Sequence, residues 1–234
     1  FAAQLAALGT VYVNDAFGTA HRAHASTAVM ASSFAPQDRV GGYLLQSEID
    51  NAKKVLEHAE RPFTAIMGGA KISDKILIIE KLLDKVDNLL IGGGMAYTFL
   101  AAQGYTVGKS LLEQDQVETV KGYLATAKER GVEIVLPSDT VVADGFAPDS
   151  PHDVVASTEI PDERMGLDIG PESIALFRSK LLDAKTIVWN GPMGVFEFEA
   201  FSAGTRGLAQ AMVDAGELGA FSIVGGGDSA AAVR

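Results

Sequence analysis

Two lysines beside a pair of glycines are the residues of this sequence best suited to bind an anion. Lys71 and Lys75 lie four residues apart in the segment GGAKISDK, residues 68–75, directly after an apolar run. At the start of a helix, this spacing would place both ammonium groups on one face, beside the partial positive charge of the helix N-terminus. The pattern indicates an anion clamp, but a solvated helix face with Asp74 and Glu80 would show the same spacing.

Glycine clusters recur at four places, at residues 68–69, 92–94, 191 and 225–227, each time between an apolar run and a stretch with helical spacing. In an open parallel sheet, ligands bind beyond the carboxyl ends of the strands, where strand gives way to helix. Glycines there allow a ligand to approach the main chain and the first N–H groups of the helix. A single cluster would be explained by the needs of the backbone turn alone, whereas four clusters together favour a phosphate or nucleotide site.

Acidic side chains near these glycines suggest further contacts. Asp228 follows three glycines and precedes Ser229, so its carboxylate could hold Mg²⁺ beside a phosphate chain. An aspartate that caps a helix N-terminus would look the same. Glu197, in NGPMGVFEFE, could bind a ribose hydroxyl or face water, and nothing local decides between these roles.

Arg22, between His21 and His24, forms a compact cationic cluster in a glycine-containing loop. A guanidinium group suits a carboxylate or a phosphate ester because it can donate two parallel hydrogen bonds. Two histidines three residues apart with no further ligand do not predict a metal site.

Two familiar nucleotide-binding patterns are incomplete. Residues 103–110, QGYTVGKS, are one residue short of G-x4-G-K-[ST] and follow a predicted helix rather than a strand, so Lys109 and Ser110 are predicted to be loop residues. Residues 225–230 fit the dinucleotide pattern G-x-G-x-x-[GA] after a strand. An NAD-dependent dehydrogenase is a hypothesis that rests on this match alone, because no acidic ribose ligand follows it.

The elements that must position these residues alternate between strand and helix. Strand, glycine turn and helix are predicted over residues 62–83, 88–104, 185–212 and 220–233. Between them we expect a helix at 117–131 closed by Gly131, strands at 132–137 and 140–144, and a helix at 171–183. Alternation of this kind predicts a doubly wound, Rossmann-like α/β domain with a mostly parallel sheet covered on both faces.

The N-terminal residues belong less clearly to this repeat. Residues 1–30 indicate a helix, a short strand and an irregular segment, and residues 41–60 indicate a helix that ends at Arg61 and Pro62. We therefore expect three parts: 1–40, an interdomain helix at 41–61, and 62–234. Because the chain opens with Phe1 inside an apolar pattern and stops at SAAAVR, we expect an internal fragment; a processed chain with frayed ends is the alternative.

Composition excludes several classes of protein. The 234 residues include 30 acidic and 19 basic side chains, giving a net charge of −11, which argues against nucleic-acid or anionic-membrane partners. The absence of cysteine excludes disulfides, thiolate metal sites and cysteine nucleophiles. No apolar run is long enough to span a bilayer, so a cytoplasmic location is expected.

Six segments together resemble one family, the phosphoglycerate kinases. They are VYVNDAFGTAHRAHAST, GGAKISDKI, LLIGGGMAYTFL, MGLDIGP, VWNGPMGVFEFE and SIVGGGDSAAAV, in that order. The resemblance implies a glycolytic, two-domain enzyme that transfers a phosphoryl group reversibly between 1,3-bisphosphoglycerate with ADP and 3-phosphoglycerate with ATP, using Mg²⁺. It also implies that residues 1–40 are a remnant of the substrate domain, that 62–234 form the nucleotide-binding domain, and that the intact enzyme is a monomer.

Carried over to this sequence, the resemblance implies that Arg22 contacts 3-phosphoglycerate. It implies that Lys71 and Lys75 contact the nucleotide phosphates, with Lys75 nearest the transferred group. Glu197 would bind the ribose, and Asn190 would lie near the phosphates. The residues that would line the adenosine pocket are Gly93, Gly94, Gly166, Leu167, Pro192 and Val195. The residues that would hold the phosphates and Mg²⁺ are Gly226, Gly227, Asp228 and Ser229, with Asp228 as the metal ligand.

The family pattern extends beyond both ends of this sequence. The catalytic arginine and most of the substrate domain would precede Phe1, and a Thr-Gly-Gly-Gly phosphate loop would follow Arg234. Many members have threonine where this chain has Ser229, which keeps the hydroxyl group. Because phosphoryl transfer depends on positioning and charge neutralisation, we expect this chain to bind nucleotide but to be inactive alone. A non-catalytic nucleotide-binding α/β module is the alternative function.

Overall fold

The computed structural model describes residues 1–232, apart from the side chain of Leu56. The chain forms two compact units, Phe1–His58 and Ala59–Arg234. The predicted helix at 41–60 forms as α2, Tyr43–His58, and belongs to the first unit. The predicted segment 220–233 ends at Val233, which lies outside the described residues. The assignment of the three predicted parts to domains stays a prediction.

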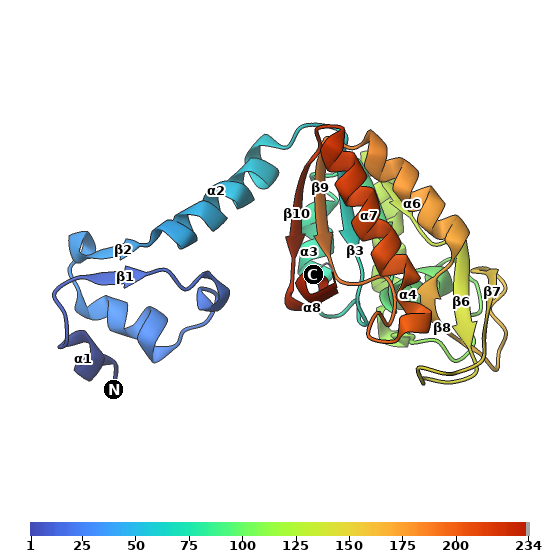
Figure 1. Ribbon diagram of the computed structural model, residues 1–234, viewed down its shortest axis with the longest axis horizontal. Helices are drawn as coiled ribbons and strands as arrows, with labels where there is room; N and C mark the ends of the chain where they lie inside the picture. Colours follow the sequence, from blue (N-terminus) through green and yellow to red (C-terminus); the bar gives the residue numbers. More distant parts are fainter. Residues whose placement is uncertain (233–234) are drawn as a thin grey trace. The chain divides into compact units, whose positions relative to one another are not determined.

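The first unit contains few regular elements (Figure 1). Strands β1, Tyr12–Asn14, and β2, Arg39–Gly41, pair in parallel. The Tyr12 hydroxyl donates a hydrogen bond to the Thr27 carbonyl oxygen at 2.7 Å, and the Tyr12 ring stacks on Phe34 at 5.8 Å. The other elements are α1 at Ala2–Ala6, 3-10 helices at Phe17–Thr19, Met30–Ser33 and Pro36–Asp38, and a π turn at Ala25–Val29.

Five parallel strands form the main sheet of the second unit, in the order β10-β9-β3-β4-β5. The central strand β3 is buried along its whole length, as expected for a strand covered on both faces. The bounds are Phe63–Met67 for β3, Asn88–Ile91 for β4, Glu133–Val135 for β5, Thr186–Asn190 for β9 and Phe221–Gly225 for β10.

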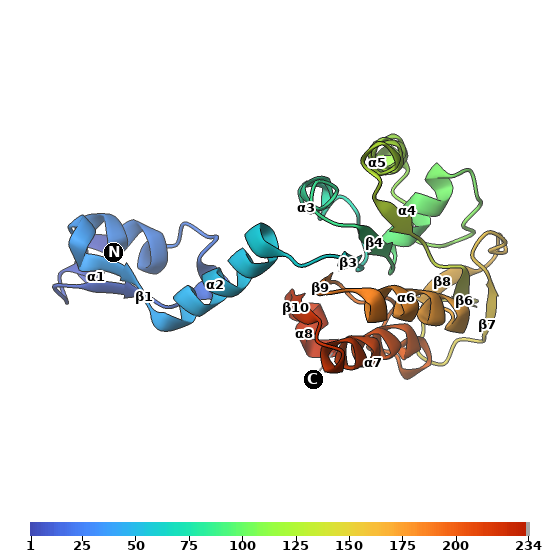
Figure 2. The same ribbon diagram turned by 90° about the horizontal axis from the view of Figure 1, so that it is seen from above.

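Helices cover both faces of this sheet, which confirms the predicted doubly wound α/β fold. Figure 2 shows α3 and α5 on one face and α6 and α7 on the other. Helix α5 ends at Gly131 as predicted, and this glycine adopts a left-handed conformation with φ of 70°. The bounds are Ile76–Leu82 for α3, Met95–Ala102 for α4, Val117–Arg130 for α5, Pro171–Asp183 for α6, Ala203–Glu217 for α7 and Gly227–Ala232 for α8; a 3-10 turn lies at Gln114–Gln116 and another at Glu199–Phe201.

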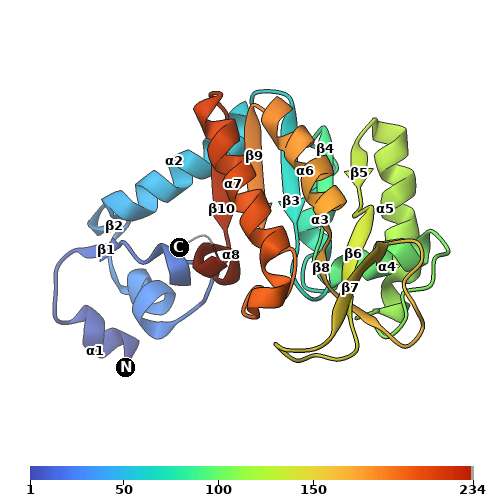
Figure 3. The same ribbon diagram turned by 45° about the vertical axis from the view of Figure 1, so that its right-hand side comes forward.

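A second, antiparallel sheet of three strands was not predicted (Figure 3). The strand expected at 140–144 forms as β6, Asp139–Ala143, but it pairs with β7, His152–Ala156, and β8, Met165–Ile169. Glycine and aspartate are depleted in strands, so the sequence MGLDI gives a weak strand signal. The small sheet matters because β8 carries two residues expected at the adenosine pocket.

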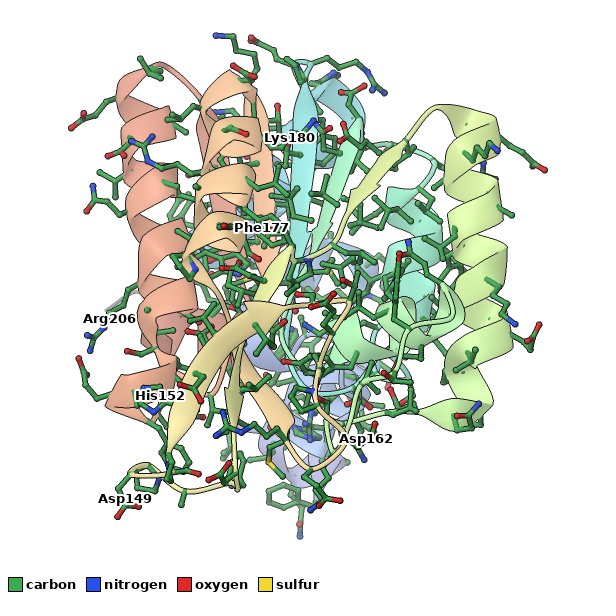
Figure 4. The ribbon with its side chains drawn as sticks, turned by 90° about the vertical axis from the view of Figure 1, so that its right-hand side faces the viewer. Asp149, His152, Asp162, Phe177, Lys180 and Arg206 are labelled. Atoms are coloured by element: carbon green, nitrogen blue, oxygen red, sulfur yellow. The ribbon has the colours of Figure 1, made fainter. Side chains whose placement is uncertain are left out.

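The main core lies between the sheet and helices α6 and α7. Trp189 on β9, Ile187, Phe177, Leu181 and Leu208 are fully buried there. In Figure 4, Phe177 points from α6 toward the sheet, whereas Arg206 on α7 points away from the protein. This rigid core fixes the carboxyl ends of β3, β4 and β9, where the glycine turns begin.

Candidate functional site

The turns after β3, β4 and β9 pack against one another at one edge of the main sheet. Gly93 adopts φ of 64°, and a Cβ atom there would lie 2.6 Å from the backbone of Gly69. Gly191 adopts φ of 96°, and a Cβ atom there would lie 2.3 Å from the Gly68 carbonyl oxygen. Both positions therefore require glycine, for conformation and for space.

A cavity of about 470 Å³ opens beside these turns. This volume lies within the usual range for small-molecule sites, about 300 to 1,000 Å³. Eight residues that the sequence assigned to a nucleotide line it: Gly93, Gly94, Gly166, Leu167, Pro192, Val195, Glu197 and Asp228. The cavity lies at the carboxyl ends of parallel strands, where doubly wound folds bind their ligands.

Contacts between β8 and its neighbours shape the cavity wall. The Gly166 N–H donates to Ser110 Oγ at 2.9 Å, and the Val195 N–H donates to the Leu167 carbonyl oxygen at 2.9 Å. A Cβ atom on Gly166 would lie 2.0 Å from the Tyr97 hydroxyl, so only glycine leaves room for that ring. Burial and the nearby Asp168 carboxylate raise the pKa of Tyr97, which keeps the phenol neutral.

A polar cluster adjoins the cavity. Lys75 Nζ donates to the Asn190 carbonyl oxygen at 3.1 Å and to Asn190 Oδ1 at 2.5 Å. Burial lowers the pKa of Lys75, while the negative charges of Asp228 and Asp74 oppose that shift. A partly buried ammonium beside glycine turns provides a positive charge that an anionic ligand can neutralise.

Residues at the end of β10 complete this cluster. Ser229 Oγ accepts a hydrogen bond from the Gly191 N–H at 2.6 Å, so its hydroxyl fixes the turn after β9. Gly226 lies against Asn190, because a Cβ atom there would lie 3.4 Å from Asn190 Nδ2. Gly227 begins α8. The cavity lining includes Asp228 but not the other residues of the cluster, which are Lys75, Asn190, Gly226, Gly227 and Ser229. Asp228 links the two, because it lines the cavity and its negative charge acts on Lys75.

The expected helical placement of the two lysines is wrong. Helix α3 begins at Ile76, so Lys75 precedes its first residue and Lys71 lies in the turn before it. The Lys75 N–H donates to the Ile72 carbonyl oxygen at 2.8 Å, which closes this turn. Lys71 is exposed and does not line the cavity, whereas Lys75 turns back to Asn190.

Asp228 is the second residue of α8 and lies in its first turn, so the alternative that it caps this helix does not describe its position. Within residues 1–232, no group of three or more acidic or histidine residues could hold a metal ion. A single exposed carboxylate fits Mg²⁺ where phosphate oxygens and water supply the other ligands, as is usual for this ion.

Lys109 and Ser110 are loop residues, as predicted. However, Lys109 also lines the cavity, and its ammonium group pairs with Glu163 at 2.5 Å. The structure gives no support to a phosphate loop here, because helix α4 rather than a strand precedes these residues.

Arg22 belongs to the first unit and is exposed. Its Nε donates to His21 Nε2 at 3.2 Å, and its backbone N–H donates to the Thr19 carbonyl oxygen at 3.0 Å. The guanidinium group is therefore accessible to an anionic ligand.

Sequence reasoning found Leu167, Pro192 and Val195 but missed the other apolar side chains of the cavity. Phe146 is 64% exposed although its ring packs against Phe198 at 5.2 Å, and Leu111 is 44% exposed. Large apolar residues in polar loops are a signal that could have found them. The other missed apolar and aromatic lining residues are Ala70, Tyr97, Met165 and Phe196.

Fold and site together define a doubly wound α/β protein with a largely apolar cavity and an adjacent lysine cluster at the carboxyl ends of its strands. A family profile described as phosphoglycerate kinase matches residues 1–234. The chain belongs to the phosphoglycerate kinase family.

Individual relatives support the assignment to this family. The chain is 55% identical to a phosphoglycerate kinase of Bifidobacterium longum (strain NCC 2705) and 53% identical to one of Nostoc sp. (strain PCC 7120), over 100% of its own length. It matches a solved phosphoglycerate kinase structure from Coxiella burnetii with a TM-score of 0.89 and 45% identity, covering 99% of this chain and 59% of that one. It spans 58% of the length of those two curated relatives.

None of the helices within residues 1–232 has the length and apolar character needed to cross a membrane.

Proposed function

We propose that the second unit binds ADP or ATP, with the adenosine in the cavity and the phosphates at the Lys75 cluster. The observation that carries this proposal is the convergence of eight residues, distant in sequence, on one cavity. Its apolar walls suit a base, and Glu197 at its lining suits a ribose hydroxyl. Gly166, Leu167, Pro192 and Val195, which all line the cavity, would contact the adenosine.

Lys75 would change partners when nucleotide binds. Its ammonium group is held by Asn190, so a phosphate must replace or share that contact. Asn190, Gly226, Gly227 and Ser229 would then position the phosphate chain, and the exposed Lys71 would add positive charge at its outer side. Asp228 would hold Mg²⁺, which neutralises phosphate charge when bound.

A whole protein as long as the curated relatives would transfer a phosphoryl group between 1,3-bisphosphoglycerate with ADP and 3-phosphoglycerate with ATP. Arg22 in the first unit would contact the phosphoglycerate. We further propose a cytoplasmic enzyme of glycolysis that acts as a monomer and has no nucleic-acid or membrane partner. Because the curated relatives are longer and phosphoryl transfer needs many positioned charges, this chain alone would bind nucleotide without turnover.

Calorimetric titration of ADP into wild type and Lys75→Ala tests the proposed site. Charge-assisted contacts contribute about 1.5 to 3 kcal/mol, and part of this is offset because Lys75 must leave Asn190. We therefore expect about tenfold weaker binding in Lys75→Ala. Lys121→Ala is the matched control, since Lys121 lies on α5 and pairs with Glu118 at 2.7 Å. Equal affinities for the two variants would contradict the proposed phosphate site.

The dehydrogenase hypothesis for the glycine pattern at 225–230 is wrong, because the phosphoglycerate kinase family profile matches residues 1–234.

A further inference from the structure

The turn that carries Lys71 and Lys75 is held from outside by one carboxylate. Glu113 Oε2 accepts hydrogen bonds from the Ile72 N–H at 2.6 Å and the Ser73 N–H at 3.1 Å. Glu113 Oε1 accepts a third, from Ser73 Oγ at 2.6 Å. All three donors lie between the two lysines, and Glu113 is 40 residues away from Ser73 along the chain.

Glu113 is itself anchored to the body of the second unit. Its backbone N–H donates to Thr98 Oγ1 at 3.3 Å, and Thr98 is 1% exposed on α4. Its carbonyl oxygen accepts from the Gln116 N–H at 3.0 Å, in the 3-10 turn that leads into α5. Through these contacts, Glu113 holds the lysine turn in a fixed position relative to helices α4 and α5.

The turn needs such support because it has little of its own. Lys71, Ser73 and Asp74 are exposed, and only Ile72 is buried. Fixing the backbone of each residue in one conformation costs conformational entropy. Charge-assisted hydrogen bonds to a carboxylate are the strong kind that can offset this cost.

We infer that Glu113 is a positioning residue that pre-orders the turn for phosphate binding by Lys75 and Lys71. This inference rests on the proposed nucleotide site. Glu113 does not line the cavity and touches neither lysine through its carboxylate contacts, so it acts through the turn.

Whether ADP binds more weakly or more tightly after Glu113 is removed separates a positioning role from a purely electrostatic one. A carboxylate near a polyanion repels it, so a role through charge alone predicts tighter ADP binding when Glu113 is removed. Positioning predicts weaker binding, because the nucleotide must then order the turn as it binds.

The test compares ADP with adenosine in calorimetric titrations of the full chain. For Glu113→Ala we expect about tenfold weaker ADP binding, equivalent to about 1.4 kcal/mol, and adenosine affinity within about twofold of wild type. Glu113→Gln should recover most of the ADP affinity, because its amide oxygen can still accept from both backbone N–H groups. Glu118→Ala, which removes an exposed glutamate of α5 paired only with Lys121 in the contacts described, should bind ADP like wild type.

Ser73→Ala provides a milder change that removes one of the three hydrogen bonds and keeps the test open should Glu113→Ala not fold. We expect about threefold weaker ADP binding for it. Thermal unfolding of each variant establishes that the titrated protein is folded.

Unchanged or tighter ADP binding in Glu113→Ala overturns the inference and leaves the proposed nucleotide site standing. If Glu113→Ala does not fold, the same result in Ser73→Ala overturns it. An equal loss for adenosine also overturns it, because the effect would then extend beyond the phosphate-binding turn. If wild type binds no ADP, the proposed function fails and the inference fails with it.

Discussion

Replacing Asp168 with asparagine should change how the stability of the second unit depends on pH. Asp168 lies on β8 and is 2% exposed. Its Oδ2 accepts from the Gly204 N–H at 2.7 Å, and its Oδ1 accepts from the Ile169 N–H at 2.9 Å. Burial raises the pKa of this carboxyl group from 3.8 to about 7, although both backbone donors oppose the shift.

The direction of the effect follows from linkage between protonation and folding. Between pH 4 and pH 7, the folded chain keeps the Asp168 proton that the unfolded chain releases, so stability falls as pH rises. Each pKa unit is worth about 1.36 kcal/mol, so about 3 kcal/mol is lost between pH 5 and pH 8, where the folded carboxyl group has also lost its proton, and almost nothing further above pH 8.

Asp168→Asn removes the titration but keeps the shape of the side chain. One of the two backbone N–H groups then faces an amide NH₂ group, which costs about 1 to 3 kcal/mol at every pH. We therefore expect the variant to be less stable than wild type at pH 5. At pH 8 its stability should equal or exceed that of wild type.

Urea unfolding followed by fluorescence measures this difference. Trp189 is the single tryptophan and is fully buried on β9, so its emission reports on the second unit. The difference in unfolding free energy between variant and wild type should change by about 3 kcal/mol from pH 5 to pH 8. A difference that stays constant over this range would refute the raised pKa of Asp168 and the reasoning built on it.

Three further predictions concern the metal, a helix cap and turnover. Asp228→Asn should reduce the enhancement of ADP binding by Mg²⁺ in calorimetry, and an undiminished enhancement would remove Asp228 as the metal ligand. Asp139 accepts from the Ser173 N–H at 2.7 Å at the start of α6, so Asp139→Ala should lower the unfolding free energy by about 2 kcal/mol in urea. A loss below about 0.5 kcal/mol would show that this cap is unimportant. In a coupled assay with 3-phosphoglycerate, ATP and Mg²⁺, the chain should show no turnover; activity within about tenfold of a full-length family enzyme, abolished by Arg22→Ala, would contradict this expectation.

The parallel sheet was predictable because four of its five strands, β3, β4, β9 and β10, are short, largely apolar runs that end at or directly before a glycine. Residues 63–67 illustrate this, since an unbroken run before Gly68 has few alternatives to a buried strand. The antiparallel sheet was not predictable in the same way. Its strand β8 contains Gly166 and Asp168, whose burial depends on Tyr97 and Gly204, which are distant in sequence.

The candidate site shows the same limit. The glycine turns were found because each lies beside its own strand. The turn at Lys71 and Lys75 was mistaken for a helix, because the residue that holds it, Glu113, comes from another segment. The apolar wall formed by Phe146 and Leu111 was missed because loop residues carry no periodicity.

Amide chemical shifts during an ADP titration test the central claim, that the cavity is a nucleotide site, most directly. We predict saturable changes at Gly69, Gly94, Gly166 and Leu167, which line the cavity. Changes at Gly104–Thr106 should be absent, because these residues line a separate cavity near α4. Saturable changes confined to that second cavity, or no saturable change at all, would contradict the account.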